Sequence, residues 1–307
     1  MRRMLSVGFA PHAVFVTCVW TLIRAGSFSG HSHWQDAVPH TPFEAGGIVL
    51  GIGACAAVLG LLLYPFQIRA VRVLEGYWDR WSLTARLADL LLAYQRRRVQ
   101  AMRRATAPEN DDERDPVPTA SERKRADVAR RLAGLPPRAA LLPTALGNAL
   151  RAGELRAGER YGLTTLQSWP RIVPQISRPL MDALNSARDM LDSSVNLCYS
   201  FLACTVALTV ATFDEPSNWW LPTAALAAAA LAYKGAVTAA QTYAQLMFVV
   251  YDLHRFDLVK ALHYRLPDHE EEWALFQRIS DALTNPLGLL PYEHAPRAPN
   301  GQDDLSG

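Results

Sequence analysis

The sequence predicts an all-α integral membrane protein with four transmembrane helices, two of which continue into cytoplasmic helices. Three observations support this fold class. Four apolar segments each have the roughly twenty residues that a helix needs to cross a bilayer. Arginine is concentrated on one side of these segments, as it is in cytoplasmic loops. The remaining segments carry apolar residues at intervals of three and four, which is typical of helices.

The overall composition conceals this division, because 50% hydrophobic and 20% charged residues would also fit a soluble protein. The two kinds of residue occupy separate blocks. Residues 65–190 contain 22 Lys and Arg against 14 Asp and Glu, whereas residues 46–63 carry no charge. Only three of the 31 basic residues are lysine, and alanine is abundant. This bias indicates a GC-rich bacterial genome, so we expect a multi-pass protein of the bacterial plasma membrane.

Residues 1–66 are predicted to hold the first two membrane helices, at 5–23 and 46–66, with a short outer loop between them. The first segment follows two arginines and resembles a signal peptide in that respect, but it is long and no cleavage site follows it. The second contains Gly47 and Gly51 at the small-residue spacing that lets membrane helices approach closely.

Residues 191–242 are predicted to form the third and fourth membrane helices, at 191–213 and 219–242, joined by a tight polar turn. Arginine is frequent in the middle of the chain and absent from this turn. An even number of crossings then places both termini and the arginine-rich middle in the cytoplasm.

Residues 67–190 are predicted to form a cytoplasmic helical region. A helix over 65–104 carries a coiled-coil-like packing seam at 3–4 spacing, which indicates an internal helix contact or a subunit contact. The seam comprises Val71, Leu74, Trp78 and Trp81, followed by Ala85, Ala88 and Leu92. Residues 105–120 are proline-rich and acidic and should be disordered. The basic runs beside them lack interleaved aromatic residues, so no nucleic acid is expected as a partner.

Further helices are predicted before and after the third and fourth membrane helices in the sequence. Thr144 is a predicted N-cap of a helix that ends near Tyr161, and the prolines that follow it predict an extended connector at Trp169-Pro170. The third helix is predicted to begin at Arg178 and the fourth to continue inward. Residues 243–285 are therefore expected to be cytoplasmic C-terminal helices, and residues 286–307 a disordered tail.

A polar seam is predicted within the third and fourth membrane helices. Four polar residues recur at i, i+4, i+7 and i+11 on each helix: Lys234, Thr238, Gln241 and Gln245 on the fourth, and Asp189, Ser193, Asn196 and Ser200 on the third. The short turn makes the helices antiparallel, so the two stripes can face each other at one depth. Either they satisfy each other's hydrogen bonds, or they line a pathway for an ion or ligand.

Other candidate sites are weaker. His31 and His33 in the outer loop could bind a transition metal, although loop histidines are usually solvated. His269-Glu270 begins like a zinc-protease motif, but Trp273 occupies the place of the second histidine. His254 lies between Asp252 and Asp257 and could form a proton-sensitive cluster. No catalytic residue, cofactor or metal site is expected, and the chain is not expected to be an enzyme.

Two functions remain open at this point. The first is a structural or interaction protein that presents a cytoplasmic helical platform to a second copy of itself or to a cytoplasmic protein, with the lipid bilayer as its other partner. The second is an oligomeric channel or transporter that uses the polar seam. The packing seam and the absence of catalytic motifs favour the first function.

Overall fold

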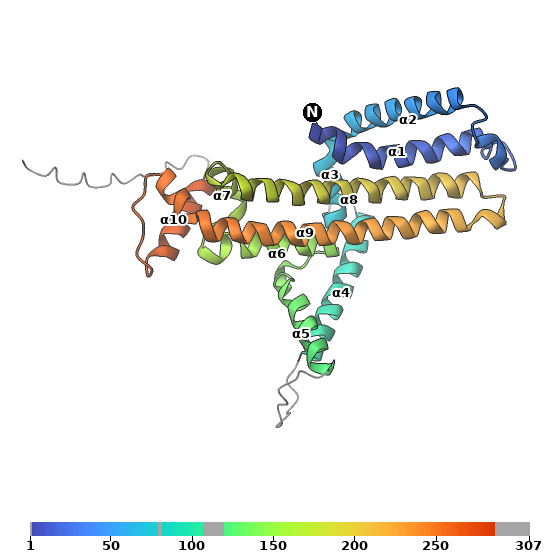
Figure 1. The fold of residues 1–307 in the computed structure, drawn as a ribbon. Helices are drawn as coiled ribbons and strands as arrows, with labels where there is room; N and C mark the ends of the chain where they lie inside the picture. Colours follow the sequence, from blue (N-terminus) through green and yellow to red (C-terminus); the bar gives the residue numbers. More distant parts are fainter. Residues whose placement is uncertain (1, 79–81, 107–119, 286–307) are drawn as a thin grey trace, which may run out of the picture. The chain divides into compact units, whose positions relative to one another are not determined.

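The protein is described by a computed structural model that covers residues 2–78, 82–106 and 120–285; the side chains of 2–7, 82 and 83 are not described. Every regular element in these ranges is a helix, so the all-α fold class is confirmed (Figure 1). The α-helices are α1 (Arg2–Arg24), α2 (Pro42–Leu63), α3 (Gln67–Glu75), α4 (Ser82–Ala105), α5 (Ala120–Ala133), α6 (Ala145–Arg156), α7 (Thr165–Ile172), α8 (Arg178–Ala211), α9 (Trp220–Ala261) and α10 (Glu272–Thr284). Short 3-10 helices connect them: η1 (Trp34–Ala37), η2 (Tyr64–Phe66), η3 (Arg138–Ala140), η4 (Glu159–Tyr161), η5 (Val173–Gln175) and η6 (Pro216–Asn218).

The chain divides into two compact units, which we describe separately. Unit 1 comprises Met1–Ala149 and Ser186–Gln241, and unit 2 comprises Leu150–Asn185 and Thr242–Gly307. Both α8 and α9 continue from one unit into the other without interruption, so the two predicted helix continuations are confirmed.

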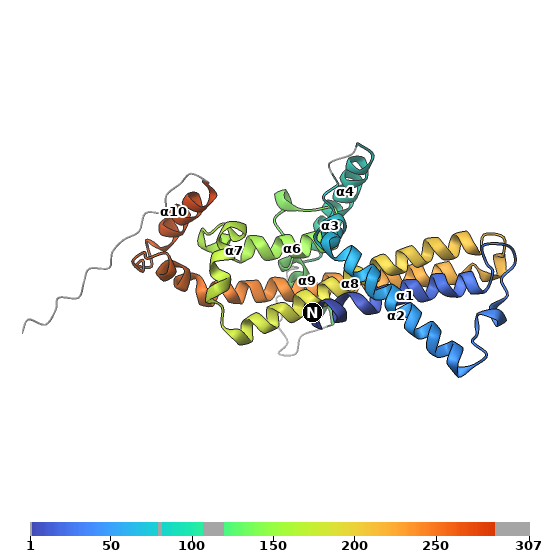
Figure 2. The same cartoon turned by 90° about the horizontal axis from the view of Figure 1, so that it is seen from above.

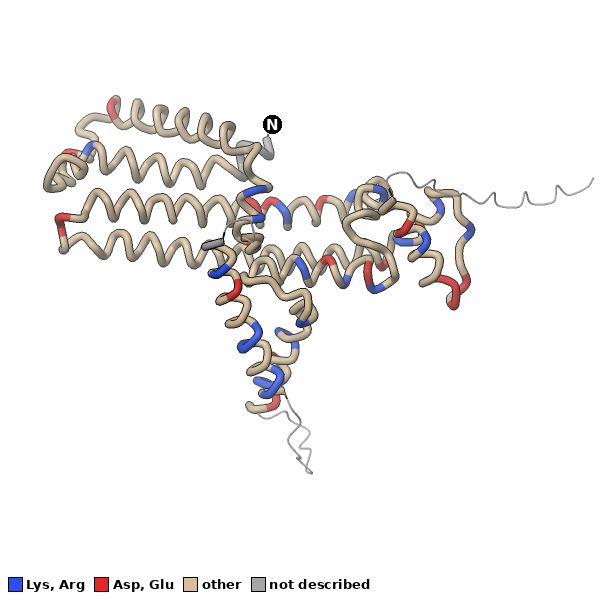
Figure 3. The backbone as a smooth tube through the Cα atoms, turned by 180° about the vertical axis from the view of Figure 1, so that it is seen from behind, with Lys and Arg blue, Asp and Glu red and all other residues tan. Residues whose placement is uncertain are grey.

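Three helices in the described ranges are long and apolar enough to cross a membrane: Pro42–Glu75, Arg178–Ala211 and Pro216–Ala261. The predicted first crossing lies in α1, where the stretch with described side chains, Gly8–Arg24, is apolar but shorter than these three. In the backbone view of Figure 3, the paired helices of unit 1 carry few charged residues over the stretch away from α4, whereas Lys and Arg are frequent on α4 and α5. This segregation follows the block composition of the sequence.

Helices α1 and α2 of unit 1 pack against each other through small residues of α2. Ala56 is completely buried, and methyl groups added at Gly53 and Gly60 would lie 3.9 Å from Phe9 and 3.1 Å from His12. These positions follow at i, i+3 and i+7, so they share one helix face. The predicted packing pair Gly47 and Gly51 lies elsewhere, because added methyl groups there would meet no atom of the described chain within 4 Å. Figure 2 shows the two helices diverging toward the loop that joins them.

The predicted continuous helix over 65–104 is wrong, because it is interrupted at Gly76. Helix α3 ends there with Gly76 in the left-handed conformation, at φ +96°. Pro143 and Thr144 lie so close that an added methyl group would be 3.1 Å from each side chain. A glycine stop is favoured here because glycine adopts positive φ without a steric penalty.

The interruption also divides the predicted packing seam. Val71 and Leu74 are partly buried on α3, Trp78 lies in the turn, and Trp81 lies outside the described residues. On α4 the seam continues: Ala88 is buried and Ala85 and Leu92 are partly buried. Gln95 and Val99 are buried at the same 3–4 spacing, and α4 packs against α5. The predicted disordered segment lies almost entirely at 107–119, outside the described residues.

Hydrogen bonds fix the start of α6 in unit 1. Thr144 Oγ1 accepts a hydrogen bond from Gly147 N at 3.0 Å, which confirms the predicted N-cap, and donates one to Glu75 O at 2.8 Å. The fully buried Asn148 amide donates to Leu142 O and accepts from Leu142 N, at 2.9 and 2.7 Å. The beginning of α6 is therefore held against the end of α3. The helix ends at Arg156, earlier than predicted, and η4 and Gly162 (φ +85°) follow.

Unit 2 has an apolar core formed by α7, α10 and the parts of α8 and α9 that belong to it. Its fully buried side chains include Tyr251, Leu258, Phe276 and Ile279. The Tyr251 hydroxyl donates to Thr165 O at 3.0 Å and lies 2.9 Å from Ser168 Oγ. Trp169 stacks on Tyr251 with ring centroids 6.2 Å apart, inside α7, so the predicted extended connector is helical.

Candidate functional site

The predicted polar seam is divided between an exposed stripe on α9 and a partly buried stripe on α8. Lys234, Thr238, Gln241 and Gln245 are all exposed, whereas Asp189, Ser193 and Asn196 are partly buried and Ser200 is buried. Within unit 1, α9 instead buries an alanine face at Ala229, Ala236, Ala239 and Ala240.

The expectation that the two stripes face each other is therefore wrong. Gly235 of α9 lies next to Ser194 of α8, where an added methyl group would be 3.4 Å from Ser194 Oγ. Small residues allow helix backbones to approach closely in a membrane, and this packing sets the rotation of α9. Its polar stripe is consequently turned away from the described residues of unit 1.

The α8 stripe helps to line a polar cavity of about 220 Å³ between α1, the end of α2 with the start of α3, and α8, all in unit 1. We call this space the α1–α2–α8 cavity. Its polar lining residues are His12, Gln67, Arg188, Asp189, Asp192 and Asn196, with Tyr64 beside them and Gly8 and Gly60 against the imidazole. Two of the predicted seam residues, Asp189 and Asn196, thus belong to this site.

The cavity lies at one end of the apolar bundle. Asp192 is nineteen residues from the end of α8 at Ala211, which corresponds to about 28 Å along a helix. Gly60 is eighteen residues from the start of α2 at Pro42, or about 27 Å. A hydrocarbon core is about 30 Å thick. In a bilayer that these helices span from the connections 25–41 and 212–219, both residues would lie near the opposite boundary, at the depth of lipid head groups.

Gln67 and Arg188 lie near Asp192 at the outer limit of hydrogen-bond and ion-pair distances. Gln67 Nε2 lies 3.4 Å from Asp192 Oδ1 and 3.5 Å from its backbone oxygen, and Arg188 Nε lies 3.9 Å from Asp192 Oδ2. His12 is only 7% exposed. No hydrogen bond to its ring nitrogens is found among the described residues, where every fully buried side-chain nitrogen or oxygen has a partner, so these nitrogens are open to the cavity that His12 lines. The site thus combines a buried imidazole with acidic and amide groups.

Sequence reasoning did not identify His12 or Gln67 as site residues. His12 lies in the first apolar segment, and an ionisable residue within a membrane segment is by default a candidate for function. That signal could have selected His12. Gln67 has no comparable signal, because it comes directly after an apolar segment where polar residues are ordinary.

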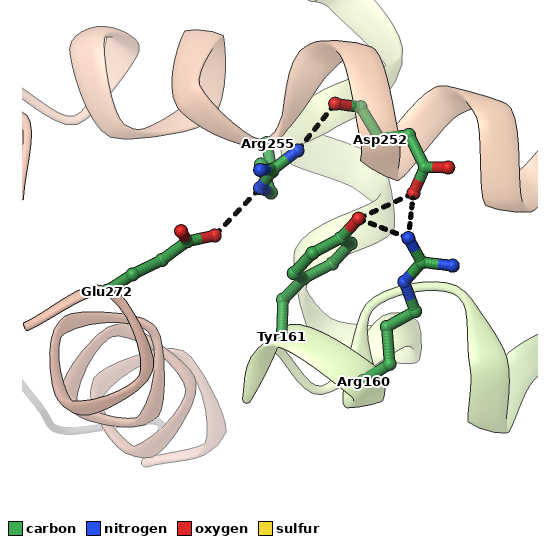
Figure 4. A network of polar contacts seen from close by, with 5 residues as sticks. All are labelled: Arg160, Tyr161, Asp252, Arg255 and Glu272. Atoms are coloured by element: carbon green, nitrogen blue, oxygen red, sulfur yellow. Dashed lines mark hydrogen bonds and ion pairs between the residues drawn. The ribbon is translucent and has the colours of Figure 1, made fainter. Parts of the chain in front are cut away.

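A second polar cluster lies within unit 2, where η4 meets α9 and α10 (Figure 4). Asp252 accepts from Arg160 at 2.8 Å and from the Tyr161 hydroxyl at 2.7 Å. Arg255 binds Glu272 at 2.8 Å and lies 4.3 Å from the Tyr161 ring centroid. Burial, together with the bond to Asp252, raises the pKa of Tyr161 above its usual value.

This cluster links segments about ninety residues apart in sequence, and its polar groups pair with one another, so its role is structural. The predicted proton-sensitive cluster around His254 is divided by it. His254 pairs with Asp257 at 3.0 Å, whereas Asp252 binds Arg160 and Tyr161.

Acidic residues also tie the connections 25–41 and 212–219 of unit 1. Glu215 accepts hydrogen bonds from Ser32 N and from the Asn218 amide. The Ser32 N–H holds the pKa of Glu215 below its usual value. Glu44 forms an ion pair with Arg24 at 2.8 Å. Within the described ranges, no three His, Cys, Asp or Glu side chains are placed to hold a metal ion, and the loop histidines belong to no such group.

Comparison with protein-family models, with curated proteins and with solved structures finds no match to this chain.

Proposed function

We propose that the chain is a multi-pass protein of the bacterial plasma membrane, with both termini in the cytoplasm, that presents a cytoplasmic helical platform to a partner. The observation that carries this proposal is the continuity of α8 and α9. Each helix runs without interruption from an apolar stretch into the buried core of unit 2. The core that would form the platform is thus built directly on membrane-spanning helices.

The topology that we propose adds α1 as a fourth crossing. Helix α1, Arg2–Arg24, has 23 residues and corresponds to about 34 Å, which is enough to cross a hydrocarbon core of about 30 Å. The arginines at the start of the chain and in residues 67–190 favour a cytoplasmic position for both. The connections 25–41 and 212–219 then lie outside.

The α9 face that carries Val249 and Leu253 is the surface that we propose for the partner. The two side chains are 40% and 64% exposed and lie one turn apart in unit 2. Full burial of an exposed side chain of this size contributes about 1.5–3 kcal/mol, and covering the parts of these two that are still exposed would contribute a fraction of that for each. The partner is a second copy of the chain or a cytoplasmic protein with a complementary apolar surface.

Replacing Leu253 by Asp is expected to release this partner, because a carboxylate cannot be buried unpaired in an apolar contact. The measurement is mass analysis of the full-length protein in nanodiscs, combined with photo-crosslinking from position 253 in cells. Ala274→Asp places the same charge on an exposed position of α10 and should leave both results unchanged. A wild-type protein that is always monomeric and forms no crosslink from position 253 would contradict the proposal.

An oligomeric channel or transporter is the second candidate function, and the exposed α9 stripe favours it. A lysine at the centre of a membrane helix costs about 2.5–3.5 kcal/mol on insertion scales. Lys234 is about 21 Å from the start of α9, beyond the middle of a core of about 30 Å, so this cost is lowered by reaching toward the head groups or by contact with water or a protein partner. An assembly that places this stripe around its axis would provide both.

Ion flux into proteoliposomes tests this second function. We expect Lys234→Ala to change the flux or its ion selectivity, because it removes a charge from the proposed pathway. Lys260→Ala removes the other lysine of α9, at an exposed position in unit 2, and should leave the flux unchanged. Liposomes that stay tight with the wild-type protein would rule the function out.

A further inference from the structure

We propose that the α1–α2–α8 cavity binds the head group of a phospholipid that carries a primary ammonium, of the phosphatidylethanolamine type. This inference is independent of the proposed interaction platform. It rests on the unpartnered imidazole of His12, on the acceptor groups opposite it, and on the level of the cavity in the apolar bundle.

His12 is the first reason to assign a ligand. The residue is more than nine-tenths buried, it lines the cavity, and its nitrogens have no hydrogen-bond partner within the described residues. No fully buried side-chain nitrogen or oxygen there lacks a partner, so the imidazole nitrogens are open to the cavity, where water or a ligand can bind them. Neutral imidazole offers one donor and one acceptor. It can therefore donate to a phosphate oxygen while accepting from an ammonium.

The other lining groups favour an ammonium over a metal ion. Asp189, Asp192, Gln67 and Asn196 all provide acceptor oxygens. The structure's described ranges contain no convergent set of three metal-ligating side chains, which a small metal ion would need. An ammonium has three N–H donors that point in different directions, so it suits acceptors that are spread around a wall. A cavity of about 220 Å³ also has room for the adjoining phosphate.

Arg188 and the apolar surroundings favour a lipid as the source of this ammonium. The Arg188 side chain is 63% exposed and lines the same cavity, where its guanidinium can bind a phosphate oxygen. Leu62, Leu63 and Tyr64 at the end of α2 are exposed beside the cavity. They provide an apolar surface for acyl chains at the depth where head groups lie. The ammonium of a zwitterionic lipid would thus bind the acidic acceptors, its phosphate would bind Arg188, and its acyl chains would lie on the apolar surface.

The test is native mass spectrometry of the wild-type, full-length protein released from nanodiscs that contain one head group each. Phosphatidylethanolamine should remain bound through delipidation. Its N,N-dimethyl and trimethyl (choline) forms should be retained progressively less, because each methyl group removes an N–H donor while the positive charge stays. Phosphatidylglycerol should not be retained. This methylation series needs no variant, so it remains decisive if substitutions impair folding.

Two variants localise the site. His12→Leu and Asp192→Asn should each lower retention of phosphatidylethanolamine about tenfold, the factor expected for loss of one hydrogen bond to a charged group. Thr238→Val, on the exposed stripe of α9, is the matched control and should retain the lipid as the wild type does. Equal retention of the choline form would overturn the proposal. Equal binding of water-soluble glycerophosphoethanolamine would overturn the assignment to a lipid.

Discussion

Replacing Phe276 by Ala is expected to destabilise unit 2 by about 3–5 kcal/mol, the range for removing a buried phenylalanine side chain. Phe276 is completely buried in the core of unit 2, and its ring lies 6.1 Å from that of Phe256. The loss combines the transfer free energy of the ring with the cavity that it leaves. We expect amide hydrogen exchange in α7 and α10 of the solubilised full-length protein to become roughly 10²–10⁴-fold faster.

Leu166→Ala is the matched control for this experiment. Leu166 is also an apolar residue of unit 2, on α7, but its side chain is 63% exposed. Its truncation removes little buried surface and should change exchange rates only slightly. If the two substitutions had equal effects, the core assigned to unit 2 would be wrong.

Gly147→Ala is expected to separate the start of α6 from the end of α3. A methyl group at this position would lie 2.1 Å from the Glu75 carbonyl oxygen and 3.0 Å from a Leu142 methyl carbon. A backbone oxygen cannot rotate away, so the helix itself must move and the Thr144 hydrogen bond to Glu75 must break. We expect a cost at or above the 1–3 kcal/mol typical of overpacking. The measurement is the temperature at which half of the solubilised protein stops eluting as a single peak in size-exclusion chromatography.

Gly51→Ala is the control for Gly147→Ala. The same methyl group added in α2 meets no described atom within 4 Å, and alanine favours helix formation by about 0.5–1 kcal/mol over glycine. This variant should keep or slightly raise the midpoint temperature. A fall equal to that of Gly147→Ala would mean that the clash with Glu75 is not the cause.

Helices α8 and α9 could be predicted well from the sequence, because apolar residues persist along both without a strong helix breaker. The interruption at Gly76 could not be predicted in this way. The 3–4 spacing of apolar residues continues across it, from Leu74 to Trp78. The left-handed turn depends on Pro143 and Thr144, which lie more than sixty residues further along the chain. In the same way, Pro170 is accommodated within α7, where Trp169 stacks on Tyr251.

In the candidate site, the spacing of polar residues could be read from the sequence, but the rotation of α9 about its axis could not. The spacing correctly placed Lys234, Thr238, Gln241 and Gln245 on one face of α9, and that face is exposed. A stripe of equal spacing does not reveal which face of a helix meets its neighbour. Here the alanine face of α9 allows the closest approach and determines the rotation. His12 could not be assigned to the cavity from the sequence alone, because its place there depends on the close approach of α1 and α2 at Gly60.

The division of unit 2 along the chain has a consequence for biogenesis. Its two segments, Leu150–Asn185 and Thr242–Gly307, are separated in sequence by the hairpin of α8 and α9. A ribosome releases the first segment well before Tyr251 and Phe276 have been synthesised, so its apolar face has no partner at that time. In the topology that we propose, the hairpin of α8 and α9 would have to enter the bilayer and return the chain to the same side before this core could close. Membrane insertion would then precede burial of the core, and a chain that failed to insert would expose the apolar face of its first segment.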